Sequence, residues 1–158
     1  MSKNITIRKL QSEDFDLGYI DLLSELTNTD KVSRIDFENT LKSISRNPNH
    51  QIWVILDSDS DSNPNKSRIL ASGTLIIEPK FIHSCSSLAH IEDIVVHPDT
   101  RGQGLGKKIV NHLIECAKQQ PNCYKISLNC SYKNIPFYTK LGLTTKERQM
   151  ILYLNKEN

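Results

Sequence analysis

The stretch from His90 to Lys107 constrains the fold more than any other part of the chain. Its first half is an apolar, β-branched run that Pro98 stops, which is typical of a central strand. Its second half carries glycines at 102, 104 and 106 and opens directly into residues 107–117, where apolar side chains recur at helical spacing. The sequence therefore predicts a buried strand, a glycine-rich turn and an amphipathic helix in direct succession.

The glycine-rich turn has the composition of an anion site. Glycines before a helix expose its first backbone N–H groups, and these donors, the helix dipole and the cations Arg101, Lys107 and Lys108 suit a phosphate or pyrophosphate. Two common phosphate motifs are excluded, because a dinucleotide fingerprint needs a glycine where Lys107 stands and a P-loop needs a serine or threonine where Lys108 stands. The alternative is a turn that only connects a strand to a helix.

Two acidic residues, Glu92 and Asp93, interrupt the apolar run of the predicted strand. Strict alternation would place their side chains on opposite faces, so both reach one cleft only if the strand is bulged there, as is common beside active sites. Such a bulge would also free a backbone N–H near Ile94 or Val95 to bind an oxyanion. A carboxylate at this place, Glu92 first, can accept a proton from an attacking amine. The alternative is that the two acids form structural ion pairs or hydrogen bonds.

The remaining patterns predict one domain, residues 1–158, in the order β-α-α-β-β-β-α-β-α-β. Strands are expected over residues 4–10, 51–56, 68–78, 91–96, 123–130 and 149–154, and helices over 12–26, 33–45, 107–117 and 134–141. Ser12 and Asn134 are the expected caps of the first and last helices, and Gly73 marks a bulge or a close backbone approach. Residues 57–67, acidic and serine-rich, are expected to form a mobile loop, with metal chelation as a minor alternative.

Composition and charge exclude several classes of function. The formal net charge is +2 and the positive charges are dispersed, so neither a nucleic acid nor a membrane is expected as a partner. The N-terminus is polar and the longest apolar runs are strand-sized, which predicts a soluble, cytoplasmic protein. The four cysteines form no Cys-x-x-Cys unit and lie at no zinc-finger spacing from a histidine, so no metal is expected. Cys116 and Cys130 are predicted to be buried free thiols.

The motif Arg101-x-x-Gly104-x-Gly106 resembles the pyrophosphate signature of the GCN5-related N-acetyltransferases, the GNAT superfamily. The resemblance implies an α/β (α+β) fold with a mixed, mostly antiparallel sheet flanked by helices, and acetyl-CoA as the cosubstrate. Across nearly the whole chain, the sequence is also similar to the eukaryotic glucosamine 6-phosphate N-acetyltransferases, most specifically in segments 78–83, 90–96, 101–107, 123–126 and 134–138. That family makes N-acetylglucosamine 6-phosphate on the route to UDP-N-acetylglucosamine, and it works as a homodimer whose protomers share substrate sites.

The same resemblance implies roles for individual residues. Glu92 is the expected base, directly or through water, with Asp93 beside it; Tyr138 would stabilise or protonate the CoA thiolate, and the main-chain carbonyl of Asn129 would hold the amine. The expected coenzyme-binding residues are Ile94, Val95, Val96, Arg101, Gly102, Gln103, Gly104, Leu105, Gly106, Lys107, Asn134 and Tyr138. The expected residues for the acceptor, a small amino sugar phosphate, are Thr27, Lys80, Phe81, Ile82, His83, Glu92, Asp93, Tyr124 and Lys125.

Two departures from the family pattern leave alternatives open. Position 129, often acidic in the family, is Asn129, and Tyr153 stands where the family commonly carries an arginine that helps bind phosphate. Either Lys80, Lys125 or Arg148 compensates, or the phosphate is held more weakly, or the acceptor differs. The alternative functions are acetyl transfer to another small amine or to a protein amine, and a non-catalytic acetyl-CoA-binding module.

Overall fold

A computed structural model describes residues 5–29, 31–57 and 68–154 of the 158-residue chain. The chain forms two compact units, residues 1–128 and residues 129–158, and each is described by itself. Of the acidic, serine-rich segment 57–67, only Asp57 is among the described residues, where it ends a strand. The loop expected there lies outside the described residues.

The first unit is built on one sheet with the strand order β1-β2-β3-β4-β5. Its strands are β1 (Ile5–Lys9), β2 (His50–Asp57), β3 (Ile69–Pro79), β4 (Ser87–Val96) and β5 (Cys123–Ser127). Neighbours from β1 to β4 pair antiparallel, whereas β4 pairs parallel with β5. Parallel neighbours need a crossover connection, and here it is the helix that follows the glycine-rich turn. The expected mixed, mostly antiparallel sheet is therefore confirmed.

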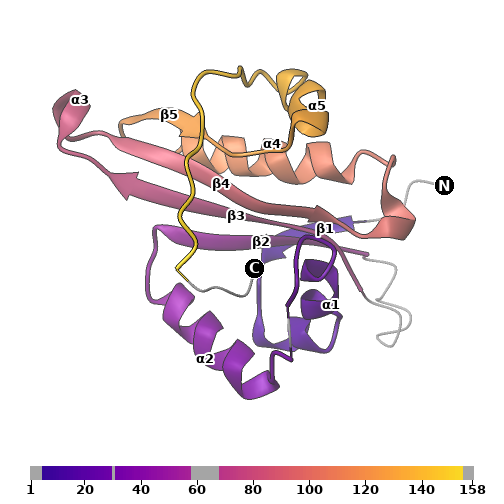
Figure 1. Cartoon of the computed structure of the whole chain (residues 1–158). Coiled ribbons are helices and arrows are strands. Elements are labelled where there is room, and N and C mark those ends of the chain that lie inside the picture. The colour runs from indigo at the N-terminus through magenta and orange to yellow at the C-terminus, as the bar shows by residue number, and fades with distance from the viewer. Residues whose placement is uncertain (1–4, 30, 58–67, 155–158) are drawn as a thin grey trace. The chain divides into compact units, whose positions relative to one another are not determined.

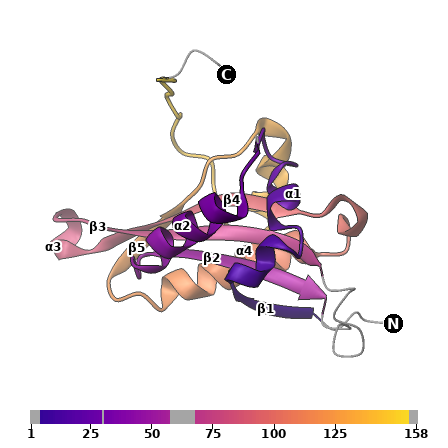
Figure 2. The ribbon, with the colours of Figure 1, turned by 90° about the horizontal axis from the view of Figure 1, so that it is seen from below.

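Helices cover both faces of this sheet (Figure 1). The helical elements of the first unit are η1 (Ser12–Phe15), α1 (Tyr19–Leu23), α2 (Arg34–Ser45), α3 (Ile82–Cys85), η4 (Pro98–Thr100) and α4 (Leu105–Lys118). Figure 2 looks at the sheet from the side of α1 and α2, with α4 behind it. The short turn α3 lies at the far end of the β3–β4 hairpin.

The core between the sheet and α4 is packed unusually closely at one point. Gly73 of β3 lies under α4, and a Cβ at this position would come within 2.6 Å of Cδ1 of Ile94 and 2.9 Å of Cδ1 of Leu113. Only a residue without a side chain leaves room for both. The close approach expected at Gly73 is confirmed.

The single helix expected over residues 12–26 is wrong. The chain forms the 3-10 turn η1, turns at Gly18 with a φ of +81°, and continues as the separate helix α1. The N-cap of η1 is Gln11 rather than Ser12. The apolar periodicity continues across the break because η1 and α1 contribute to the same core. There, Phe15 and Tyr19 each pack against Phe37 of α2.

The second unit contains η5 (Tyr132–Asn134) and α5 (Ile135–Thr139), and its described residues form no strand. The strand expected over residues 149–154 is therefore wrong. The five apolar side chains from Met150 to Leu154 are between 60% and 95% exposed. An apolar segment becomes a strand only where a neighbouring backbone pairs with it, and the described residues of this unit supply none.

The cysteines are all free, and Cys85 and Cys130 are exposed whereas Cys116 and Cys123 are partly buried. The burial expected for Cys130 is wrong, and that of Cys116 is only partial. Within the described ranges, no group of three histidine, cysteine or acidic side chains is arranged to hold a metal ion. No helix of those ranges is long and apolar enough to cross a membrane.

Candidate active site

A β-bulge in β4 lies at the acidic pair. Thr74 of β3 pairs with Glu92, and Ser72 pairs with Val95, so one residue of β3 faces two residues of β4. The extra residue is accommodated by Asp93, whose φ is +53°. The bulge that both carboxylates would need in order to reach one cleft is therefore present.

The bulge brings both carboxylates to the sheet face that α1 covers. Burial raises the pKa of the Glu92 carboxyl, the negative charge of Asp93 raises it further, and His90 opposes both. Burial also raises the pKa of Tyr19, in α1, to about 12, and the charge of Asp93 adds to that rise. Asp93 thus acts on groups from both α1 and β4. A carboxylate with a raised pKa is a stronger proton acceptor than an exposed one.

A chain of polar contacts crosses three strands beside Glu92. The Glu78 carboxylate, in β3, is ion-paired with the Lys80 ammonium, and its other oxygen, Oε2, lies 2.9 Å from Nε2 of His90 in β4. Nδ1 of the same ring lies 3.3 Å from Oγ of Ser127 in β5. The ammonium of Lys80 first, and His90 second, lower the pKa of Glu78. Glu78 is therefore an ionised acceptor for both partners.

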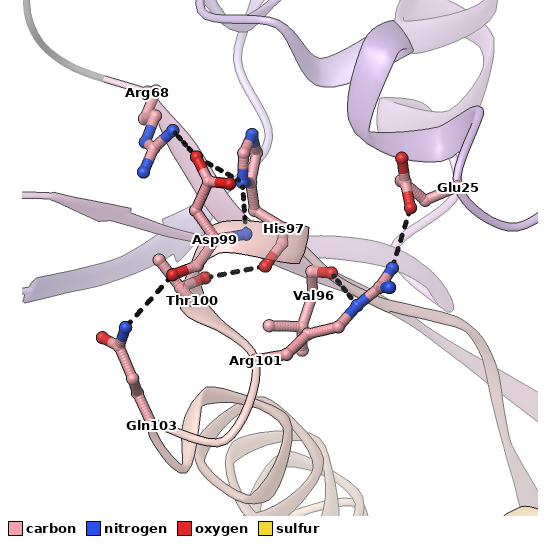
Figure 3. Close-up of polar contacts among 8 residues, drawn as sticks. All are labelled: Glu25, Arg68, Val96, His97, Asp99, Thr100, Arg101 and Gln103. Atoms are coloured by element: carbon pink, nitrogen blue, oxygen red, sulfur yellow. Dashed lines mark hydrogen bonds and ion pairs between the residues drawn. The ribbon is translucent and has the colours of Figure 1, made fainter.

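The turn after β4 is braced by its own polar groups (Figure 3). Oγ1 of the buried Thr100 donates to the His97 carbonyl at 3.1 Å, and Nε2 of Gln103 donates to the Asp99 carbonyl at 3.2 Å. The Asp99 carboxylate is 3.0 Å from Nη1 of Arg68, which precedes β3. These contacts hold the backbone of η4 and of the following glycines in one shape.

Arg101 is held between β4 and the segment after α1, as Figure 3 shows. Its Nε donates to the Val96 carbonyl at 3.2 Å, and its Nη2 donates to the Glu25 carboxylate at 2.9 Å. The guanidinium is exposed, so it remains available to an anion from solvent. The pyrophosphate role expected for it stays a prediction.

The glycines open the N-terminus of α4 to solvent. Gly102 and Gly104 have φ values of +79° and +81°, and a Cβ at either position would meet no described atom within 4 Å. Gly104 is the N-cap of α4, so the first N–H groups of the helix, which have no acceptor within the helix, follow this open turn directly. The side chain of Leu105, the first residue of α4, is buried in the core. The turn has the donors that a pyrophosphate needs.

Most of the expected acceptor residues gather at the end of the β3–β4 hairpin. The His83 ring lies 4.3 Å from that of Tyr124 in β5, and the Lys125 ammonium lies 5.8 Å from the Tyr124 ring centre. Phe81 and Ile82 are exposed in the same hairpin end. Three successive residues there, 83–85, have left-handed backbones with φ between +53° and +60°.

Thr27 lies elsewhere, in the exposed segment after α1, two residues beyond Glu25. It is close in sequence to Glu25, which binds Arg101 of the glycine-rich turn.

Three expected site residues, Asn129, Asn134 and Tyr138, belong to the second unit. The Tyr138 ring packs edge-on against Phe137 at 4.9 Å. Burial raises the pKa of the Tyr138 phenol, and Cys130 adds to this. A phenol with a raised pKa keeps its proton at neutral pH, as a donor to a thiolate must. Asn134 is the N-cap residue of α5, as expected, but its side chain makes no capping hydrogen bond.

Sequence reasoning missed Glu78, His90, Ser127 and Glu25 as parts of the site. A signal existed for His90, which stands two residues before Glu92 and therefore on the same face of the strand. No local pattern pointed to Glu25, because its partner Arg101 is 76 positions away.

Comparison with known proteins agrees with this geometry. The model of the acetyltransferase (GNAT) family matches residues 7–143. Glucosamine 6-phosphate N-acetyltransferase of Arabidopsis thaliana is 38% identical over 156 residues, which are 98% of this chain and 100% of that protein. Its crystal structure superposes with a TM-score of 0.88 and covers 97% of this chain and 100% of the other.

A second relative, glucosamine 6-phosphate N-acetyltransferase 1 of Dictyostelium discoideum, is 38% identical over 150 residues, 95% of this chain and 91% of that protein. The match of the family model begins within β1, includes the bulge of β4 and the glycine-rich turn, and extends past the end of α5. The chain therefore belongs to the acetyltransferase (GNAT) family.

Proposed function

We propose that this protein transfers the acetyl group of acetyl-CoA to the amine of D-glucosamine 6-phosphate, which yields N-acetyl-D-glucosamine 6-phosphate and CoA for UDP-N-acetylglucosamine biosynthesis. The observation that carries the proposal is the bulge of β4, which turns Glu92 and Asp93 to one face just before the anion-binding turn. The names of the relatives matched over nearly their whole length support this acceptor.

The coenzyme would be held by the turn and by the start of α4. Arg101 and the N–H groups that follow Gly102 and Gly104 supply charge and donors for a pyrophosphate. The Val96 carbonyl, which accepts from Nε of Arg101 at 3.2 Å, ties this part of β4 to the turn. The expected coenzyme contacts of Ile94 and Val95 are with the backbone, because the Val95 side chain is buried in the α1 and α2 core and Ile94 reaches over Gly73.

The reaction needs a neutral amine, because a protonated amine has no lone pair. Glu92 accepts the amine proton, directly or through a water, and its raised pKa suits this task. The amine nitrogen then attacks the thioester carbonyl carbon, and a backbone N–H of the bulge near Ile94 or Val95 stabilises the developing oxyanion. When the carbon–sulfur bond breaks, Tyr138 donates its proton to the thiolate or stabilises it. The nitrogen, which gained a positive charge in the attack, releases a proton to solvent to give the amide, and a phenolate left at Tyr138 takes a proton back from solvent. Asn129 would hold the amine through its carbonyl.

The acceptor phosphate would lie near the hairpin end. Lys80 and Lys125 are the nearby cations, with His83 and Tyr124 stacked beside them. We infer that Lys80 and Lys125 compensate for the family arginine, in whose place Tyr153 stands.

We also propose that the protein works as a homodimer. The exposed segment from Met150 to Leu154 is a continuous apolar run of strand length, and it would gain a partner if it paired with a second copy of the chain. Gel filtration at several protein concentrations tests this, and a monomer at all of them would refute it.

The deciding experiment for the proposed function is product mass. The purified protein is incubated with acetyl-CoA and, separately, glucosamine 6-phosphate, glucosamine, spermidine and a lysine peptide. We expect acetylation of glucosamine 6-phosphate far above the others. If another amine is acetylated instead, the proposed acceptor is wrong while the acetyltransferase assignment stands. If none is, a non-catalytic coenzyme-binding role gains support.

A further inference from the structure

The chain of contacts through Glu78 joins two parts of the proposed site. At one end is Lys80, the cation proposed for the acceptor phosphate, and at the other is His90, two residues before the proposed base Glu92. Glu78 and His90 are partly exposed, so the contacts lie at a surface that a ligand can reach. A buried structural ion pair would be closed to solvent, and this one is not.

Each of these contacts orients the side chain that makes the next one. Ser127 hydrogen-bonds Nδ1 of the His90 ring, which sets the plane of the ring. Because an ionised carboxylate only accepts, Nε2 of His90 donates to Oε2 of Glu78. One oxygen of Glu78 is thus taken by the ring and the other by the Lys80 ammonium, so the carboxylate cannot turn freely.

The backbone of Lys80 is anchored as well, since its N–H donates to the Ser86 carbonyl at 2.8 Å and closes the hairpin end. A lysine side chain on a fixed backbone still has four rotatable bonds, and the carboxylate of Glu78 is what selects among their conformations. The selected conformation points the ammonium back along the sheet towards His90.

The spacing between His90 and Glu92 follows from the geometry of β4. Side chains two residues apart on one face of a strand are about 7 Å apart, so Glu92 lies about that far beyond His90. The ammonium of Lys80 and the side chain of Glu92 thus lie on the same face of the β3–β4 pair, with His90 between them along β4. A sugar with a phosphate at one end and an ammonium at the other has the complementary charges.

We propose that Glu78 is a positioning residue that determines specificity: it holds the Lys80 ammonium on the face of the sheet that carries Glu92, where the phosphate of an amino sugar phosphate would meet it. This inference rests on the proposed function. Glu78 touches neither coenzyme nor reacting atoms in this role, and it acts through Lys80.

The test is the preference for a phosphorylated acceptor in Glu78→Gln, which keeps the size of the side chain but removes its charge. The kcat/KM for glucosamine 6-phosphate and that for glucosamine are measured by product mass, and the inhibition constant of glucose 6-phosphate is measured alongside. We expect the ratio of the two kcat/KM values to fall about tenfold and the inhibition constant to rise by a similar factor. A purely structural role would lower turnover of both acceptors equally and leave the ratio unchanged.

A double-mutant cycle with Lys80→Met isolates the coupling. Once Lys80 is gone, Glu78→Gln should change the ratio by less than about twofold, because the group that it steers is absent. Glu115→Gln is the matched control, since it makes the same chemical change in an ion pair with Lys118 on α4, at 2.8 Å, away from the site. The control should leave the ratio and the inhibition constant at the wild-type values.

Failure of this inference and failure of the proposed function are distinct results. If wild-type protein does not acetylate glucosamine 6-phosphate, the proposed function is refuted, and this inference with it. If wild-type protein does, but Glu78→Gln keeps or increases the ratio, only the role of Glu78 is refuted. An increase would mean that Glu78 acts mainly by repelling the phosphate.

Discussion

Replacing Gly73 with alanine tests the packing that supports the bulge. The new Cβ would lie 2.6 Å from Cδ1 of Ile94, whereas carbon atoms in contact are about 3.5–4.0 Å apart, so the Ile94 methyl group must move by roughly 1 Å. Leu113 of α4 is also too close, at 2.9 Å. Overpacking of this kind costs about 1–3 kcal/mol, and the loss of glycine flexibility in the unfolded chain returns about 0.4–1 kcal/mol.

We therefore expect Gly73→Ala to lower the free energy of unfolding by about 1–2 kcal/mol, which is roughly 2–8 °C in Tm for a chain of this length. Trp53 is the sole tryptophan and pairs with Gly73 across β2 and β3, so its fluorescence during urea unfolding reports on this site. The midpoint should fall while the slope with urea stays constant.

The companion variant Ile94→Val removes the methyl group that the new Cβ would strike. In that background, Gly73→Ala should cost about 1 kcal/mol less than in the wild type, because the closest overlap is gone. Equal costs in the two backgrounds, or an unchanged midpoint in the single variant, would show that α4 and β3 are not in the tight contact described.

Three further predictions concern the proposed site. Glu92→Gln should lower kcat by about 10²–10⁴ and leave acetyl-CoA affinity by calorimetry nearly unchanged, because it removes a base and keeps the shape; unchanged turnover would refute the base. The pKa of Glu92 is raised above 4.5, so kcat/KM should fall, as pH is lowered, at a higher pH than an ordinary glutamate would give. Asp93→Asn should move that fall to lower pH, since it removes a like charge, and a shift in the opposite direction would contradict this cause. Gly104→Ala should weaken acetyl-CoA binding and cost about 1–2 kcal/mol of stability, because an alanine at φ +81° is strained; a variant with wild-type calorimetry and Tm would speak against a left-handed turn.

The strand, turn and helix from β4 to α4 were predictable because each carries a strong local signal. The apolar run and Pro98 mark the strand, and the helical period of residues 107–117 marks the helix, which begins two residues earlier at Leu105. Helix α2 was predictable for the same reason, and Ser33 caps it by accepting a hydrogen bond from the Asp36 N–H at 3.1 Å. The bulge was predictable only on the condition that both carboxylates serve one cleft, because adjacent residues of a regular strand face opposite sides of the sheet.

The remaining features depend on partners that are distant in sequence. The break at Gly18 could not be predicted from the apolar periodicity, because the residues on both sides of it pack into the same core and so keep the periodicity. Residues 149–154 have the composition of a strand, but composition does not supply a neighbouring backbone. The contact between Glu78 and His90 depends on the register of β3 against β4, which a hairpin end of irregular shape does not reveal.

That hairpin end contains three successive left-handed residues, His83, Ser84 and Cys85, and none is a glycine. A left-handed backbone costs an ordinary residue about 1–2 kcal/mol, so the three residues together raise the conformational free energy of the turn by about 3–6 kcal/mol. The free energy that maintains it must come from its attachments, the flanking strands and the stacking of His83 on Tyr124. The hairpin end is thus rigid only while the sheet beneath it is intact, and partial opening of the β3–β4 pair would release the turn and separate the residues that it carries.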